Sequence, residues 1–158
     1  MTLALELQIE LPESESIMLP TQADFEHWIS TALDKANHQD EVALTLRIVE
    51  EAEGRELNAR WRGKDYATNV LSFPLKMPEY VGIPYIGDLV ICAAVVAREA
   101  TEQNKQAMAH WAHLTIHGLL HLLGYDHKTD AQADEMEALE VQIMTSLGYP
   151  DPYSLQEN

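Results

Sequence analysis

The sequence is poor in cysteine, in positive charge and in long apolar runs. Cys92 is the one cysteine among 158 residues, which excludes a disulfide framework within the chain and fits a reducing compartment. Ten lysines and arginines stand against 26 acidic residues, giving a formal net charge of −16. Such a field repels nucleic acid at long range, so a nucleic-acid substrate would require a local basic patch. The most apolar stretch, Trp111–Leu123, includes three histidines and is too short to span a bilayer.

Targeting and linker signals are also missing from the sequence. The first residues carry neither a basic segment nor a long apolar one, so we expect no signal peptide and a cytoplasmic protein. Neither a membrane nor DNA is an expected partner. The chain has no repeats, linkers or low-complexity runs, and its length suits one domain, residues 1–158, with a substantial core.

Apolar periodicity predicts the secondary structure. Alternating apolar residues or short apolar runs predict four strands, at Leu3–Leu11, Val42–Ile48, Val70–Phe73 and Ile86–Ile91. Helical spacing predicts five helices, over Gln22–Ala36, Glu50–Trp61, Ala93–Asn104, Gln106–Leu123 and Asp130–Leu147. Because the strands come early and the helices late, the predicted fold is α+β, a small mixed four-stranded sheet packed by about five helices.

Two segments carry more specific expectations. In the helix predicted from Glu50, the candidate core contacts are Ala52, Leu57 and Trp61, while Gly54 lowers the helix propensity. Between Pro74 and Pro84, three prolines and a glycine predict a long irregular loop, and loops of that length are often functional.

Three of the seven histidines lie close together, at positions 117, 121 and 127. His117 and His121 are four residues apart, so a helix would place both imidazoles on one face, where they could grip one metal ion. Gly124 suits the left-handed turn that ends a helix, and that turn could bring His127 back as a third ligand. Three neutral imidazoles with an open fourth position describe a catalytic zinc site. We therefore predict one Zn²⁺ per chain on this zinc-hydrolase-like helix.

Other polar residues near these histidines have less specific roles. His110 and His113 lie on the same predicted helix. His113 is expected to support the site or to belong to the core, because a fourth imidazole would occupy the position that water needs. Asp126 precedes His127 and could orient that imidazole, handle a proton as a catalytic residue, or cap the following turn.

Positive charge is concentrated in one part of the chain. Arg55, Arg60, Arg62 and Lys64 are four of the ten lysines and arginines, and none follows Thr129. The cluster is either a solvated helix end or a phosphate-contacting patch on an acidic protein. Arginine suits the second role because its planar fork can engage two phosphate oxygens. The choice depends on how near the cluster lies to the histidines.

The histidine spacing can be compared with that of zinc proteases. His117, His121, Gly124 and His127 reproduce the metzincin pattern H-E-x-x-H-x-x-G-x-x-H, but Gly118 stands where those proteases carry the glutamate that acts as general base. The spacing supports zinc, and the missing glutamate argues against ordinary peptide hydrolysis.

Two longer strings resemble a different family. The segment His117–His127 is similar to the signature of the YbeY family of bacterial endoribonucleases. Leu57–Pro74 matches the same family through an aromatic–arginine pair, Lys-Asp and Thr-Asn-Val-Leu-Ser-Phe-Pro, with Ala67 in place of a common proline. Gly87–Asp88 and Glu135–Glu140 also fit, so the resemblance covers nearly the whole chain from Leu44 onward.

This resemblance implies a cytoplasmic, metal-dependent, single-strand-specific endoribonuclease. Its expected process is maturation of the 3′ end of 16S ribosomal RNA together with ribosome quality control, and its expected partners are ribosomal RNA and the small subunit with its proteins. The family's zinc ligands correspond to His117, His121 and His127, and Arg62 corresponds to a catalytic or RNA-contacting arginine.

Two alternatives from other classes remain at this point. One is a zinc-dependent protease or other hydrolase. The other is a ribosome assembly factor with a structural metal, which the acidic charge favours because ribosomal proteins are basic. The sequence also leaves open whether water or the RNA 2′-hydroxyl is the nucleophile.

Overall fold

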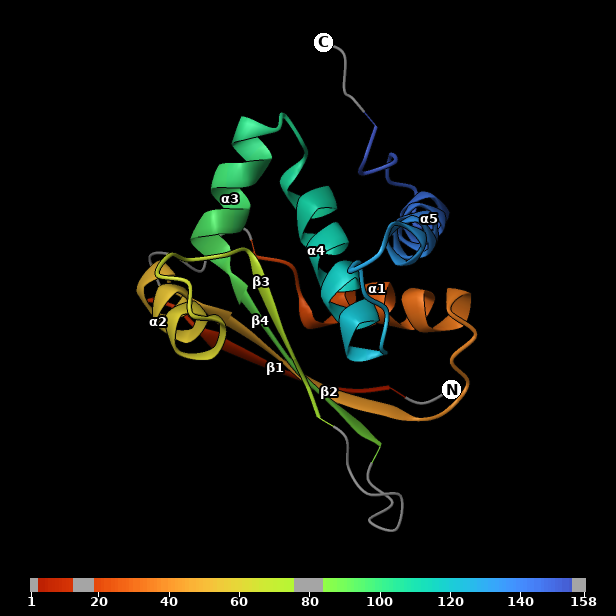
Figure 1. Ribbon diagram of the computed structural model, residues 1–158, viewed down its shortest axis with the longest axis horizontal. Coiled ribbons are helices and arrows are strands. Elements are labelled where there is room, and N and C mark those ends of the chain that lie inside the picture. Colours follow the sequence, from red (N-terminus) through yellow and green to blue (C-terminus); the bar gives the residue numbers. More distant parts are fainter. Residues whose placement is uncertain (1–2, 13–18, 76–83, 155–158) are drawn as a thin grey trace.

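A mixed sheet forms the centre of the molecule. The computed structural model describes residues 3–12, 19–75 and 84–154 (Figure 1). Its strands are β1 (Leu3–Glu10), β2 (Val42–Val49), β3 (Val70–Pro74) and β4 (Tyr85–Cys92). They lie in the order β1-β2-β4-β3, with β1, β2 and β4 parallel and β3 antiparallel at the edge. The predicted four-stranded mixed sheet is confirmed.

The helices also fall within a few residues of the predicted bounds. They are α1 (Gln22–Lys35), α2 (Glu51–Arg62), α3 (Ala93–Glu102), α4 (Ala107–Leu122) and α5 (Asp130–Ser146). Capping boxes at Thr21 and Thr129 start α1 and α5, because each side chain accepts the backbone N–H three residues on. The α+β fold is confirmed.

Most helices cover one face of the sheet. Figure 1 shows α1, α4 and α5 together on one side of the strands, and α2 lies on the other side. The main core joins Leu44, Leu46 and Leu89 of the sheet to apolar side chains of these helices. The central helix, α4, is largely buried, so its position is fixed by contacts along most of its length.

The second face of the sheet is covered by α2. Val49 and Val90 point away from the main core because successive side chains of a strand alternate between faces, and Leu57 of α2 packs against their cluster. The prediction that Trp61 is a core contact is wrong, since its exposed fraction is 63%. Ala52 is exposed as well.

Trp61 and Ala52 are exposed because α2 lies very close to the sheet at another position. Gly54 and Asn58 are the buried residues of this helix, and a Cβ added at Gly54 would lie 3.4 Å from Cβ of Cys92. The helix therefore contacts the sheet through its smallest residue, and Trp61 is left at the edge, where its ring packs edge-on against Phe73.

Two further expectations concern loops and membranes. The predicted loop Pro74–Pro84 lies mostly outside the described residues, since 76–83 are not described. In the ranges that the structure describes, none of the helices combines the length and apolarity needed to cross a bilayer.

Candidate metal centre

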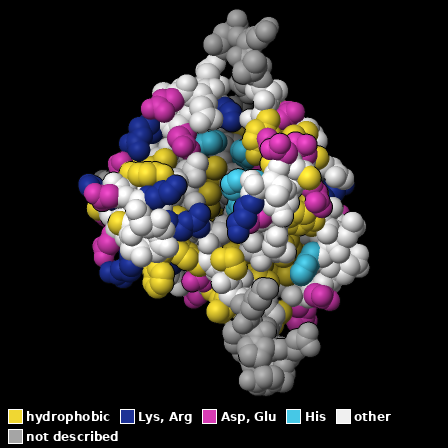
Figure 2. All heavy atoms as spheres, in the orientation of Figure 1, with side chains coloured by type: hydrophobic (Ala, Val, Ile, Leu, Met, Phe, Trp, Pro, Cys, Tyr) yellow, Lys and Arg dark blue, Asp and Glu magenta, His cyan; other side chains and the backbone are white. Residues whose placement is uncertain are grey.

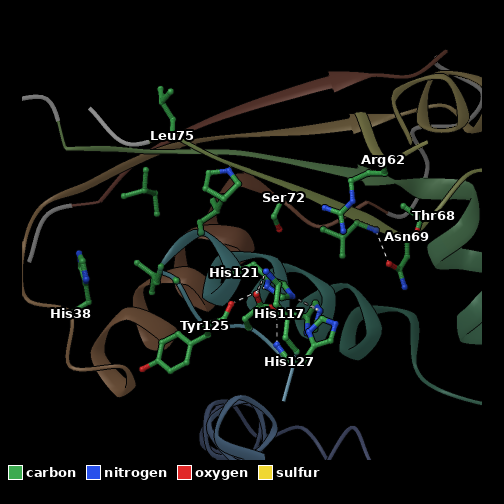
Figure 3. A pocket seen from close by; sticks show the side chains of 18 residues that line it. His38, Arg62, Thr68, Asn69, Ser72, Leu75, His117, His121, Tyr125 and His127 are labelled. Carbon is green, nitrogen blue, oxygen red and sulfur yellow. Dashed lines mark hydrogen bonds and ion pairs between the residues drawn. The ribbon is translucent and has the colours of Figure 1, made fainter. Parts of the chain in front are cut away.

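The end of α4 brings the three predicted histidine ligands together. His117 and His121 lie one turn apart on the helix, which ends at Leu122. Gly124 has φ 105°, a left-handed backbone that glycine adopts readily. The N–H of Tyr125 then donates to the carbonyl of Leu120 at 3.0 Å and turns the chain back. In consequence, one ligand atom from each of His117, His121 and His127 lies within 4.8 Å of the others (Figure 3).

The ring nitrogens of two of these histidines are oriented by hydrogen bonds. Nδ1 of His117 donates to the Glu140 carboxylate at 2.5 Å, and Nδ1 of His121 donates to the Tyr125 carbonyl at 3.0 Å. Both Nε2 atoms are then left with lone pairs, and they face each other at 3.2 Å. Such an arrangement is favourable only when a positive charge lies between them.

This spacing fits a metal ion. Two nitrogens bound to one tetrahedral zinc ion, at Zn–N distances of about 2.0–2.1 Å, lie roughly 3.3 Å apart. The Nε2 atoms of His117 and His121 match that separation. Burial lowers the pKa of His121, and the neighbouring His117 and His127 lower it further. His121 is therefore neutral at physiological pH, as a metal ligand must be.

The histidines line a groove of about 1050 Å³. One end of it includes Arg62 and Asn69, the other end includes His38 and Leu75, and Ser72 lies between them. Figure 3 shows Arg62 and Asn69 on one side of the histidine cluster and His38 and Leu75 on the other. In Figure 2, histidine side chains lie near the middle of this face with lysine and arginine side chains beside them. The groove thus combines metal-binding groups with cations.

The arginines of the basic cluster have different surroundings in the structure. Arg55 pairs with Asp65 at 2.8 Å and Arg60 pairs with Glu56 at 3.1 Å, and neither arginine lines the groove. Arg62 is the last residue of α2 and reaches into the groove. Among the described residues it has no carboxylate partner within ion-pair distance. Its charge is therefore available to an anion beside the histidines.

Asp126 lies in the groove and contacts the backbone of its neighbour. Its Oδ1 accepts the N–H of His127 at 2.8 Å, and its Oδ2 is 3.7 Å from Nζ of Lys128. The hydrogen bond from His127 lowers the pKa of Asp126, and the charge of Lys128 adds to that effect. A carboxylate of lowered pKa is a weaker proton acceptor, so this geometry favours a role in holding His127.

Sequence reasoning missed Glu140, which lies behind His117. This α5 residue is fully buried and also accepts a hydrogen bond from Nε2 of His113 at 3.3 Å and one from the hydroxyl of Tyr153. Burial alone would raise the pKa of Glu140, but the hydrogen bonds from His113, His117 and Tyr153 outweigh it and lower the pKa to about 2. A signal was present, because a glutamate stands on the apolar face between Met136 and Ile143.

A second buried network supports the polar end of the groove. His110 is 4% exposed, and its Nε2 lies 2.9 Å from Oε1 of Glu99. The same carboxylate accepts from Nδ2 of Asn69 at 3.0 Å, and Oδ1 of Asn69 accepts the N–H of Val70 at 2.7 Å. Asn69 is thus fixed where it lines the groove. His110 therefore lies in this network, apart from the candidate ligands.

Gly118 packs directly against the sheet. A Cβ at this position would lie 2.8 Å from Cδ2 of Leu89 and 3.1 Å from Cγ2 of Val70. The carbonyl of Gly118 accepts a hydrogen bond from Oγ of Ser72 at 3.1 Å. The helix and the edge strand β3 are therefore in close contact beside the histidines, with no space for a larger residue.

Comparisons with known proteins agree with the earlier resemblance. The family model described as Endoribonuclease YbeY matches residues 8–148. A relative from Stutzerimonas stutzeri named Endoribonuclease YbeY is 56% identical over 149 residues, covering 94% of this chain and 92% of its own. A relative of the same name from Pseudomonas fluorescens is 55% identical over 153 residues, covering 96% of this chain and 99% of its own. The solution structure of TM1509 from Thermotoga maritima shares the fold at TM-score 0.55 and 23% identity, covering 95% and 99%.

Proposed function

The chain belongs to the endoribonuclease YbeY family, and we propose that it is a zinc-dependent endoribonuclease that cleaves single-stranded RNA. The observation that carries this proposal is the position of Arg62. Its guanidinium, which has no carboxylate partner in the described part of the chain, lines the same groove as the three imidazoles. An RNA phosphodiester suits this groove, because its oxygens can be bound by both a Lewis acid and the bidentate guanidinium.

We assign the metal to His117, His121 and His127. The lone pairs of His117 and His121 converge, and their Nδ1 atoms are held by Glu140 and by the Tyr125 carbonyl. Such outer partners fix the tautomer and orientation of ligand histidines. Zinc held by these residues would supply Lewis acidity toward the nucleophile and a phosphoryl oxygen.

Three other residues of the groove have proposed roles, two toward the RNA and one toward His127. Arg62 binds the scissile phosphate and stabilises the negative charge that grows on it in the transition state. Asp126 is a positioning residue for His127, because its carboxylate accepts the backbone N–H of that ligand. Asn69 is held in place by its hydrogen bond to Glu99, and its side chain contacts the RNA strand. A groove of this kind admits an unpaired strand, whose backbone can approach the histidines closely.

The biological setting proposed here follows from the family resemblance. We propose maturation of the 3′ end of 16S ribosomal RNA and ribosome quality control in the cytoplasm, with the small subunit and its proteins as partners. The net charge of −16 supports contacts with basic ribosomal proteins outside the groove. The family match over residues 8–148 supports one catalytic domain over residues 1–158.

The decisive experiment measures cleavage of a labelled single-stranded RNA. We expect the parent protein to lose activity after chelation and to regain it with Zn²⁺. His117→Ala should abolish cleavage, and Arg62→Gln should reduce it by about 10²–10³-fold, as for other donors that stabilise transition-state charge. Arg60→Gln is the matched control, because it removes the same charge from the same helix outside the groove.

Two results would contradict the proposal. Equal losses in Arg62→Gln and Arg60→Gln would show that net charge, and not a groove contact, determines cleavage. Full cleavage by His117→Ala, in preparations freed of contaminating nucleases, would remove the metal centre from the reaction.

A further inference from the structure

Glu140 is a buried carboxylate with an unusual set of partners. Its side chain is fully buried, yet none of the lysines and arginines that the structure describes lies within ion-pair distance of it. Its hydrogen-bond donors are His113, His117 and the hydroxyl of Tyr153. These hydrogen bonds stabilise the ionised carboxylate, and a positive charge at the adjacent histidine site would stabilise it further.

Tyr153 comes from the segment that follows α5. Gly148 turns the chain with φ 89°, and Nζ of Lys105 donates to the carbonyl of Pro152 at 3.1 Å. The ring of Tyr153 packs edge-on against His113, with centroids 5.3 Å apart. Although 44% of Tyr153 is exposed, its hydroxyl reaches inward to Glu140. We call residues 149–154 the C-terminal segment.

We propose that Glu140 and Tyr153 are positioning residues for the metal centre, and that they couple metal binding at His117 to docking of the C-terminal segment. This inference rests on the proposed metal site. A cation held by His117 would place positive charge next to the buried carboxylate, through the imidazole that donates to it. In return, the carboxylate fixes the ring and makes Nε2 a stronger donor.

Tyr153 contributes by fixing the carboxylate. Oε1 of Glu140 faces His117, while Oε2 accepts from both His113 and Tyr153. Without the tyrosine hydroxyl, the carboxylate loses one of its hydrogen bonds and can rotate away from His117 more easily. A loss of this preorganisation weakens metal binding. Coupling is reciprocal, so a bound metal must favour the docked C-terminal segment by the same factor.

The test measures Zn²⁺ affinity of the full chain by competition with a chromophoric chelator. Glu140→Gln keeps an oxygen that can accept from Nδ1 of His117 but removes the charge, and we expect it to weaken Zn²⁺ binding by about 10–100-fold. Tyr153→Phe keeps the ring on His113 and removes only the hydroxyl, and we expect a loss of up to about tenfold. Asp134→Asn is the control, because it neutralises an exposed carboxylate on the same helix.

A second readout separates positioning from a merely structural role. Thermal unfolding in chelator reports the metal-free stability of each variant, and hydrogen exchange reports docking of the C-terminal segment. In the parent protein, Zn²⁺ should slow exchange at the Tyr153 amide, which donates to Asp151, and Tyr153→Phe should abolish this effect of the metal.

The outcomes are distinct. A parent protein that binds no Zn²⁺ would overturn the proposed metal centre itself. Parent binding that is unchanged in Glu140→Gln and Tyr153→Phe relative to Asp134→Asn would overturn only this inference, even if both variants unfold earlier in chelator. If Glu140→Gln does not fold, Tyr153→Phe alone decides, because its change lies on a partly exposed side chain.

Discussion

Replacing Gly118 by alanine probes how closely α4 approaches the sheet. The added Cβ would lie 2.8 Å from Cδ2 of Leu89, 3.1 Å from Cγ2 of Val70 and 3.3 Å from Oγ of Ser72. Leu89 is fully buried, so its methyl group cannot turn into open space. Gly118→Ala must therefore displace Leu89 within the core or push α4 away from β3.

Two opposing contributions set the expected change in the free energy of unfolding. Alanine is more favourable than glycine inside a helix by about 0.8–1.0 kcal/mol. Overpacking a closely packed core costs about 1–3 kcal/mol. We expect overpacking to dominate, so Gly118→Ala should lower the free energy of unfolding by up to roughly 2 kcal/mol.

Gly54→Ala provides the matched control. This glycine is also helical and buried, but its added Cβ would lie 3.4 Å from Cβ and 3.5 Å from Sγ of Cys92, which are ordinary contacts. We expect Gly54→Ala to raise the free energy of unfolding by up to about 1 kcal/mol. Urea unfolding of both variants in chelator, followed by circular dichroism, isolates the overpacking cost from helix propensity. If Gly118→Ala proves as stable as Gly54→Ala, the close packing inferred at Gly118 is refuted.

Three further predictions concern charge and pH. Asp126→Asn keeps an oxygen that accepts the His127 N–H, so we expect RNA cleavage within a few fold of the parent; a loss of about 10²–10⁴-fold would instead identify Asp126 as a proton acceptor. The slope of log binding constant against log salt concentration reports the number of phosphate contacts. Arg62→Gln should reduce this slope for RNA by about one contact, whereas Arg60→Gln should leave it unchanged. Burial lowers the pKa of His110 below its usual 6.5, partly opposed by Glu99. The unfolded chain therefore takes up that proton first, and stability falls as pH drops below about 6.5. Urea midpoints at pH 7.5 and 5.5 should shift less in His110→Gln than in the parent.

Local spacing in the sequence was enough to predict that the three histidines lie together. It was not enough to predict which charged side chains have a partner of opposite charge. The positions of His117, His121 and Gly124 specify a helix face and a turn, and both depend on neighbours in sequence. The family resemblance pointed to Arg62, but charge and spacing alone did not separate it from Arg55 and Arg60, because the distinction comes from carboxylates that pair with the other two.

The misassigned Trp61 and the missed Glu140 have different causes. Trp61 follows the buried residues Gly54 and Asn58 at helical spacing, so its register predicts burial, yet its ring lies exposed at the edge against Phe73. Glu140 was passed over because it is charged, yet its register between Met136 and Ile143 places it on the buried face. The helical register therefore indicated the burial of Glu140, but the exposure of Trp61 depends on tertiary packing at the end of α2.

Gly118 also accounts for the difference between this site and that of a zinc protease. Its Cβ direction leads toward Leu89, Val70 and Ser72, so a glutamate there would collide with the sheet before its carboxylate could serve the histidines. Gly118→Glu would thus destabilise the fold without creating a peptidase. The same close contact holds β3 against α4 through the Ser72–Gly118 hydrogen bond, and β3 forms one wall of the groove that Arg62 enters. Gly118 therefore leaves no protease base and also allows the close packing of β3 that forms the groove shared by the histidines and Arg62.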